Sequence, residues 1–219
     1  MKLTEFECYK FLKKYNIDIP KHNIATDIFL AKKYAKKIKY PVVMKIISNN
    51  ILHKTEAKGV FTGVLNEKDL EEKYNKLLAN ADIFFKSKQN KHKPKIDGIL
   101  IEEQKQGTEV IIGGKLDPQF GKTIMFGLGG IFVELLNDVS FRLVPLTKKD
   151  AFELINEIKA KKILGNFRNI KTNKQKLIDL ILKISKMFEC ENIVEMDFNP
   201  VIVNEKEAVV CDARIVLDK

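Results

Sequence analysis

The end of the chain most constrains its fold. Residues 193–203 (IVEMDFNPVIV) and 208–217 (AVVCDARIVL) are two apolar runs joined by the short polar segment 204–207. Ile- and Val-rich runs on either side of a few polar residues are typical of an antiparallel hairpin. If the turn centres on Glu205 and Lys206, the numbers of paired residues sum to 411. The sequence therefore predicts a closing antiparallel sheet with a defined register.

That register brings oxygen ligands together. Asp197 and Asn199 lie two apart and share a face of the strand, and Asn199 falls opposite Asp212, at about 5 Å. Such oxygens suit Mg²⁺, which takes one or two carboxylates plus phosphate oxygens. Arg214 shares that face and would contact phosphate or neutralise the acids. A polar outer face of a half-exposed sheet remains the alternative, and Pro200 or a one-residue slip would undo the geometry.

The rest of the chain predicts a mixed α+β architecture in two lobes. Apolar residues at helical spacing and capping residues predict helices over 4–15, 26–40, 66–80 and 173–188, and a further helix capped by Thr147. Short apolar runs predict strands over 42–47, 60–64, 98–103, 108–115, 122–127 and 132–136. The lysine-rich segment 86–95 reads as a solvated loop near a boundary, so we expect subdomains of residues 1–97 and 98–219.

Composition places the chain among soluble globular proteins, with 45% hydrophobic and 31% charged residues. No apolar run approaches the roughly 18 residues of a membrane span, and the N-terminus lacks the apolar segment of a signal peptide. We therefore expect a cytoplasmic protein without a membrane partner. Cys8, Cys190 and Cys211 are too widely spaced to indicate a disulfide framework or a zinc ribbon.

The charge is concentrated in the N-terminal part. Residues 1–95 hold 21 lysines, no arginine and 10 acidic residues, a net of +11, whereas the remainder has a net of −1. Such a basic half suits a polyanion, such as nucleic acid, an anionic membrane or a nucleotide triphosphate, or is simply a lysine-rich surface. Because arginine is the usual reader of base edges, we expect no nucleic-acid partner.

Two residues of the segment KIISNNILHKTEAKG could carry chemistry. Lys45 interrupts an apolar strand, which is unusual unless its ammonium meets an anion. His53 is the one histidine of three in a motif-like setting, and a neutral imidazole beside a triphosphate can act as a nucleophile or phosphate carrier. On composition alone, a surface histidine is the favoured interpretation.

Two loops are suggestive. The run GLGG at 127–130 would let backbone N–H groups approach an anion, although a tight hairpin turn would look the same. The strand ending ILIEEQ at 99–104 and the acid Glu109 would suit a hinge over a purine and its ribose. The alternative is that these acidic residues simply lie at exposed ends of loops.

Three stretches carry a resemblance: KIISNNILHKTEAKGV, DPQFGKTIMFGLGGIFVELLNDVSFRLVPLTKKDA, and EMDFNPVIV with VVCDARI. They closely resemble the ATP-grasp subunit of ADP-forming acyl-CoA synthetases, the relatives of succinyl-CoA synthetase, and the resemblance covers nearly the whole chain. It implies an ATP-grasp fold of two α+β subdomains clasping a nucleotide. It also implies a ligase that forms acyl-CoA, ADP and phosphate from acid, CoA and ATP, reversibly. A CoA-binding alpha subunit would be the partner and would carry the principal phosphohistidine.

The resemblance also implies roles for single residues. His53 would take part in the phosphoryl relay as a second phosphohistidine. The Mg²⁺ ligands would be Asp197, Asn199 and Asp212. Contacts to ATP or ADP would come from Lys45, Lys54, Glu102, Glu103, Gln104, Glu109, Gly129, Gly130 and Arg214. The sequence departs from the family at Lys58, where the motif has its first glycine, and in the hinge, which reads IEEQ rather than VQEM.

Two other functions remain as alternatives. One is the ATP-grasp part of an acyl-CoA-synthetase-like protein acetyltransferase, in which the nucleotide would be regulatory. The sequence contains no acetyltransferase segment, which weighs against it. The other is a basic RNA-binding module, which needs exposed aromatic residues among the basic ones. Phe84 and Phe85 are the only such pair beside the lysine-rich loop.

Overall fold

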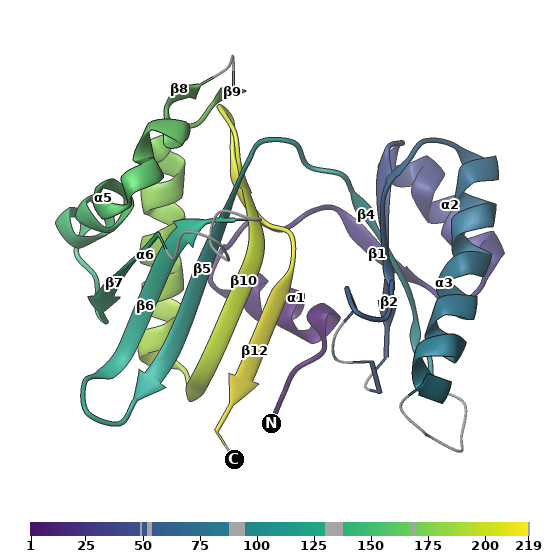
Figure 1. Cartoon of the computed structure of the whole chain (residues 1–219), viewed down its shortest axis with the longest axis horizontal. Helices are drawn as coiled ribbons and strands as arrows, with labels where there is room; N and C mark the ends of the chain where they lie inside the picture. The colour runs from purple at the N-terminus through teal and green to yellow at the C-terminus, as the bar shows by residue number, and fades with distance from the viewer. Residues whose placement is uncertain (49, 52–53, 88–94, 130–137, 168–169, 219) are drawn as a thin grey trace. The chain divides into compact units, whose positions relative to one another are not determined.

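A computed structural model describes residues 1–48, 50–51, 54–87, 95–129, 138–167 and 170–218. The chain forms two compact units (Figure 1). Unit 1 consists of Met1–Ile19 and Lys105–Lys219, and unit 2 is Pro20–Gln104. None of the described helices has the length and apolar character that a membrane crossing requires.

Unit 2 is a four-stranded antiparallel sheet with two helices on one face (Figure 1). The strands, in the order β1-β4-β2-β3, are β1 (His22–Ala25), β4 (Gly98–Glu103), β2 (Val42–Ile47) and β3 (Val60–Val64). The helices are α2 (Ile28–Ile38) and α3 (Glu67–Ser87). Apolar residues at helical spacing, among them Ala31, Ala35, Leu70 and Leu77, are buried against Met44 of the sheet.

Unit 1 is built on a six-stranded antiparallel sheet with helices on one face (Figure 1). Its strands are β5 (Thr108–Asp117), β6 (Gly121–Leu128), β7 (Val139–Leu143), β10 (Ile193–Val203), β11 (Ala208–Val210) and β12 (Ala213–Leu217). The order is β11-β10-β5-β6-β7, and β12 also pairs with β10. The other elements are α1 (Glu5–Lys14), α5 (Lys148–Glu157), η1 (Lys159–Leu164), β8 (Asn166–Phe167), β9 (Ile170–Lys171) and α6 (Lys174–Cys190).

The two faces of the unit-1 sheet differ. Alternate residues of a strand point to opposite faces. On β10, Met196 and Phe198 are buried on the side of α6, and a Cβ added at Gly114 would meet the side chains of Met196 and Phe188. Asp197 and its pairing partner Gly113 therefore point the other way. We call the face opposite α5 and α6, which carries Asp197, the far face.

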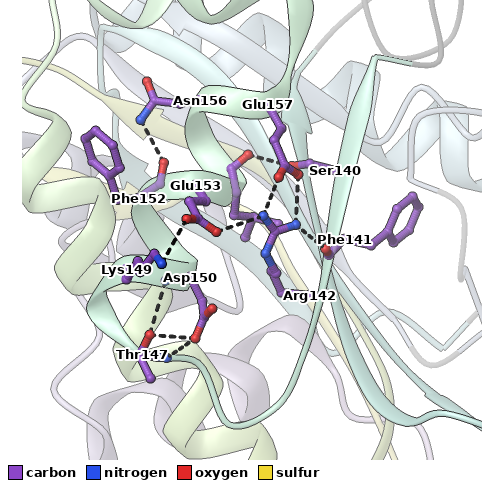
Figure 2. Close-up of polar contacts among 11 residues, drawn as sticks. Ser140, Phe141, Arg142, Thr147, Lys149, Asp150, Phe152, Glu153, Asn156 and Glu157 are labelled. Carbon is purple, nitrogen blue, oxygen red and sulfur yellow. Dashed lines mark hydrogen bonds and ion pairs between the residues drawn. The ribbon is translucent and has the colours of Figure 1, made fainter.

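Polar contacts attach α5 to β7 (Figure 2). Arg142 donates hydrogen bonds to both carboxylate oxygens of Glu157, and Ser140 donates from its hydroxyl to the Leu154 carbonyl oxygen at 2.6 Å. Thr147 begins α5 with the predicted capping box. Phe141 lies between Ser140 and Arg142 in sequence, and its ring points to the other side of the strand (Figure 2).

The predicted register of the closing hairpin is confirmed on both ladders, as the pairs Asp197 with Arg214 and Val201 with Val210 show. The predicted strand over 132–136 lies outside the described residues. The units differ from the expected subdomains 1–97 and 98–219 at both ends. Strand β4 belongs to unit 2 because it pairs with β1 and β2. Helix α1 belongs to unit 1, where the Tyr9 hydroxyl donates to the Cys211 carbonyl oxygen at 2.8 Å.

Candidate functional site

The candidate site residues of unit 2 include a buried ion pair. Lys45 in β2 and Glu102 in β4 are only 5% and 1% exposed, and the Lys45 Nζ lies 2.8 Å from the Glu102 Oε2. Val43 pairs with Glu102, and Lys45 lies two residues after Val43 on the same strand. Lys45 is therefore the diagonal neighbour of Glu102 on the same face of the sheet. A buried ammonium without an anion would be very costly. The anion predicted for Lys45 is thus supplied, at least in part, by the protein itself.

The predicted adenine hinge is held by contacts within unit 2. The Gln104 side-chain oxygen accepts a hydrogen bond from the Gly63 N–H at 2.7 Å, and the Glu103 N–H donates to the Lys21 carbonyl oxygen at 2.8 Å. The side chains of Glu102 and Gln104 therefore both have partners within unit 2. Any recognition of a base edge at this hinge would fall mainly to the backbone.

Lys58 and Gly59 end the segment that contains His53. Lys58 has a φ of 47°, in the left-handed region that favours glycine. At Gly59 the reason for glycine is contact, since a Cβ would lie 2.6 Å from the Ile46 Cγ2. Lys54 is half-buried, and its backbone carbonyl oxygen accepts a hydrogen bond from the Gly59 N–H at 2.7 Å. His53 itself lies outside the described residues, and its predicted role stays a prediction.

The candidate site residues of unit 1 include a group of charges on the far face of its sheet. Burial raises the pKa of the Asp197 carboxyl, and the nearby Asp212 carboxylate raises it further, whereas the Arg214 guanidinium lowers it. Arg214 Nη2 lies 3.2 Å from Glu195 Oε1. Its Nε is buried and has no hydrogen-bond partner among the described residues. The sequence predicted Asp197, Asp212 and Arg214 but missed Glu195, although Glu195 shares the face of Asp197 two residues before it.

Asn199 does not pair with Asp212 as predicted. The ladder between β10 and β12 ends with the pair Phe198 and Ala213, and the N–H groups of Cys211 and Asp212 both donate to the Pro200 carbonyl oxygen, at 3.0 and 3.3 Å. The peptide bond between Asn199 and Pro200 is cis, and the Asn199 side chain is exposed. The turn position alone predicted the register but not this local irregularity at Pro200.

The predicted ribose ligand Glu109 lies at the start of β5 and is exposed. Gly129 donates its N–H to the Glu109 carbonyl oxygen at 2.8 Å, and a Cβ on Gly129 would lie 3.0 Å from the Glu109 Cβ. The first of the two predicted loop glycines therefore packs directly against the predicted ribose ligand. Gly130 lies outside the described residues.

The carboxylates of Asp197 and Asp212 suit Mg²⁺ better than a metal ion whose ligands all come from the protein. Within the described part of the chain, no group of three or more His, Cys, Asp or Glu residues is placed to hold a metal ion. Asp197 and Asp212 provide two carboxylates, and Mg²⁺ usually keeps several waters and takes its other ligands from phosphates. Burial and the Asp212 carboxylate, which both raise the pKa of Asp197, disfavour its ionised form, and a divalent cation would offset this effect.

Comparison with known proteins gives the family. A family model described as an ATP-grasp domain matches residues 1–217. The chain belongs to the ATP-grasp family. This ATP-grasp chain is 44% identical, over 98% of its length, to the Pyrococcus furiosus protein named acetate–CoA ligase [ADP-forming] II subunit beta, of which it covers 91%. It therefore falls in the group that includes these beta subunits, as the sequence resemblance predicted.

Two further relatives of this ATP-grasp chain are informative. The Archaeoglobus fulgidus acetate–CoA ligase [ADP-forming] II is 43% identical over 99% of this chain, but the match covers 30% of that longer protein. A solved structure of Ca. Korarchaeum cryptofilum acetyl-coenzyme A synthetase 1 matches with a TM-score of 0.82 and 36% identity, over 99% of this chain and 93% of the other. That structure contains coenzyme A and Mg-AMPPCP, and its phosphohistidine segment points towards the nucleotide binding site.

Proposed function

We propose that this chain is the nucleotide-binding beta subunit of an ADP-forming acyl-CoA synthetase. The reaction joins an acid and CoA with conversion of ATP to ADP and phosphate, and it is reversible. The observation that carries the proposal is the 44% identity over nearly the whole of a beta subunit with that name. The carboxylates of Asp197 and Asp212 and the buried ammonium of Lys45 support the proposal, because both suit a magnesium-bound polyphosphate.

Each unit, taken by itself, offers residues suited to a nucleotide. Lys45, oriented by Glu102, contacts the phosphates, while Glu109 holds the ribose hydroxyls. Asp197 and Asp212, with the amide oxygen of Asn199, hold Mg²⁺, which when bound offsets the negative charge of the phosphates. Phosphoryl transfer demands mainly such positioning and charge neutralisation from a protein. The protein groups therefore act before the chemical step, by fixing the γ-phosphoryl group in one orientation.

The phosphoryl acceptor is a histidine. The unprotonated ring nitrogen of a neutral imidazole forms a bond to the γ-phosphorus while the bond to the bridging oxygen breaks, and ADP leaves with that electron pair. We assign one such role to His53, which passes the group on to the principal histidine of the partner. Splitting the reaction in this way joins two sites that are too far apart for direct transfer.

The partner is a CoA-binding alpha subunit. This chain covers 91% of a separate beta subunit but only 30% of a single-chain ligase, so the rest of the machinery lies on another chain or segment. Acid and CoA would bind there. The cytoplasm is the compartment that we propose for the complex.

The test uses γ-labelled Mg-ATP, with and without the partner subunit. We expect Asp212→Ala to abolish label transfer, whereas Asp179→Ala, an exposed acid on α6, transfers label like the wild type. We expect His53→Ala to block transfer to the partner and to leave nucleotide binding intact, with His92→Ala as its control. Acyl-CoA synthesis at the wild-type rate in His53→Ala would remove His53 from the mechanism, and full transfer in Asp212→Ala would remove the metal site.

A further inference from the structure

The proposed metal ligand Asp212 lies at a break in the closing hairpin. Strand β11 ends at Val210 and β12 begins at Ala213, so Cys211 and Asp212 belong to neither strand. The neighbouring strand β10 is itself irregular opposite them, at Pro200. Regular pairing of the sheet therefore does not fix the direction of the Asp212 side chain, and other contacts have to do so.

The peptide group between Cys211 and Asp212 is held at both of its polar atoms. The Asp212 N–H donates to the Pro200 carbonyl oxygen at 3.3 Å, and this oxygen also accepts the Cys211 N–H. At the other end of the same peptide group, the Cys211 carbonyl oxygen accepts a hydrogen bond from the Tyr9 hydroxyl at 2.8 Å. Because a peptide group is planar, bonds at both ends fix the orientation of its plane. They thereby restrict the direction in which the Asp212 side chain leaves the backbone.

Tyr9 has little freedom to move away from the Cys211 carbonyl oxygen. Its side chain is fully buried, and its hydroxyl also lies 3.0 Å from the Oε1 of Glu5, one turn earlier on α1. Helix α1 packs beside β12 (Figure 1), and just before the helix the Leu3 N–H donates to the Ile215 carbonyl oxygen at 3.0 Å. The hydroxyl is therefore held both by its own helix and by the attachment of that helix to the hairpin.

The choice of residue types indicates that these polar groups are used. Glu5 is only 4% exposed, although glutamate is almost never buried unless it is paired. A buried hydroxyl or carboxyl destabilises the fold unless it is hydrogen-bonded, so phenylalanine at position 9 would fill the same space without that requirement. The hydroxyl of Tyr9 thus provides what packing alone does not, which is a donor for the backbone next to Asp212.

We propose that Tyr9, held by Glu5, is a positioning residue of the metal site, which fixes the Asp212 carboxylate in the direction required to bind Mg²⁺. This inference rests on the proposed function, in which Asp212 is a metal ligand. Mg²⁺ demands nearly ideal octahedral geometry, so a small change in the direction of one carboxylate weakens its binding. Loss of a residue that orients a ligand typically lowers metal affinity by about 10- to 100-fold.

The same helix offers a matched control. Tyr15, at the C-terminal end of α1, donates from its hydroxyl to the Glu191 carboxylate. Tyr9→Phe and Tyr15→Phe each remove one hydroxyl that bonds to a distant segment of the chain, but only the bond of Tyr9 ends next to Asp212. If both hydroxyls were purely structural, both variants would lose stability and neither would change metal binding.

The first test measures how Mg²⁺ changes the Kd for ADP, by calorimetry of the two-subunit enzyme in EDTA and in excess Mg²⁺. We expect Mg²⁺ to tighten ADP binding in the wild type and in Tyr15→Phe. In Tyr9→Phe we expect this gain to be about tenfold smaller, with the Kd in EDTA unchanged. The full gain in Tyr9→Phe would overturn the inference. A wild type whose Kd for ADP does not respond to Mg²⁺ would instead refute the proposed function.

The second test is hydrogen exchange of the full chain without metal or nucleotide, read by mass spectrometry. Because the Tyr9 bond holds the peptide group whose N–H donates to Pro200, we expect the Asp212 amide to exchange about fivefold faster in Tyr9→Phe, which corresponds to one net hydrogen bond. We expect no change at Asp212 in Tyr15→Phe. Unchanged exchange in Tyr9→Phe, or equal acceleration in both variants, would show that Tyr9 does not position Asp212.

Discussion

The buried pair of Lys45 and Glu102 allows a quantitative prediction for unit 2. Both side chains are almost fully buried, and the Nζ-to-Oε2 distance is 2.8 Å. Removal of one member of a buried pair typically costs 3–5 kcal/mol, because the other charge loses its compensation. Since Gln keeps the shape and the acceptor oxygen of Glu, we expect Glu102→Gln to lower the free energy of unfolding by about 3 kcal/mol.

A double variant at Lys45 and Glu102 tests whether the loss of stability in the single variants comes from the charge that is left without its partner. Replacement of a whole buried ion pair by apolar residues of similar size is often neutral or stabilising. We therefore expect Lys45→Met/Glu102→Leu to be more stable than either Lys45→Met or Glu102→Leu alone. Its nucleotide affinity should nevertheless be low, because Lys45 is the proposed phosphate ligand. Stability and binding would then change in opposite directions.

The assay is urea unfolding followed by far-UV circular dichroism, since the chain has no tryptophan. A control is Lys149→Met, which removes a lysine from an exposed ion pair with Glu153 on α5. We expect this control to cost less than about 1 kcal/mol. The reasoning would be refuted if the double variant were as unstable as the sum of the two single variants, or if Glu102→Gln had no effect.

Three further variants test local features of the fold. We expect Lys58→Gly to raise the free energy of unfolding by about 0.5–1 kcal/mol, because it relieves a left-handed φ; a loss of stability in urea would contradict this. We expect Lys122→Met to cost about 2 kcal/mol, because the Lys122 ammonium donates to three carbonyl oxygens at the end of α6, the shortest at 2.5 Å, while the exposed control Lys176→Met should be neutral. The hydrogen bond from Tyr15 to Glu191 raises the pKa of Tyr15 from 10.0 to about 12. Because the folded protein then keeps this proton to higher pH than the unfolded chain, the bond stabilises fully below pH 10 and is lost between pH 10 and 12. The stability difference between wild type and Tyr15→Phe should therefore shrink over that interval, and a constant difference would show that the bond does not set the pKa.

The closing hairpin shows how far the sequence predicts this fold. Its register follows from the position of one polar turn, because the side-chain period of a strand leaves little freedom once one face is buried. The departure at Pro200 depends on which carbonyl accepts the Cys211 and Asp212 N–H groups, a choice that no local pattern specifies. The prediction of converging acids was therefore sound for Asp197 and Asp212, and wrong for the pairing of Asn199.

The lysine in β2 illustrates a second limit. A charge within an apolar strand predicts that an anion lies nearby, but it does not say which one. Glu102 is 57 residues away in sequence, and only the pairing of β2 with β4 brings it to Lys45. The same pairing moves residues 98–103 into unit 2, which the lysine-rich loop before them gave no reason to expect. Local signals predicted the elements well, whereas partners and boundaries depend on contacts between distant segments.

The connection of unit 2 to the rest of the chain has a consequence for engineering. The unit is an insertion between Ile19 and Lys105, and its two ends are adjacent strands, with His22 paired to Glu102 and the Glu103 N–H bonded to the Lys21 carbonyl oxygen. Entry and exit are therefore about one strand spacing apart, close to 4.8 Å. A short turn could close either piece after excision, so residues 20–104 form a natural cassette that can be exchanged between relatives without lengthening the polypeptide that remains.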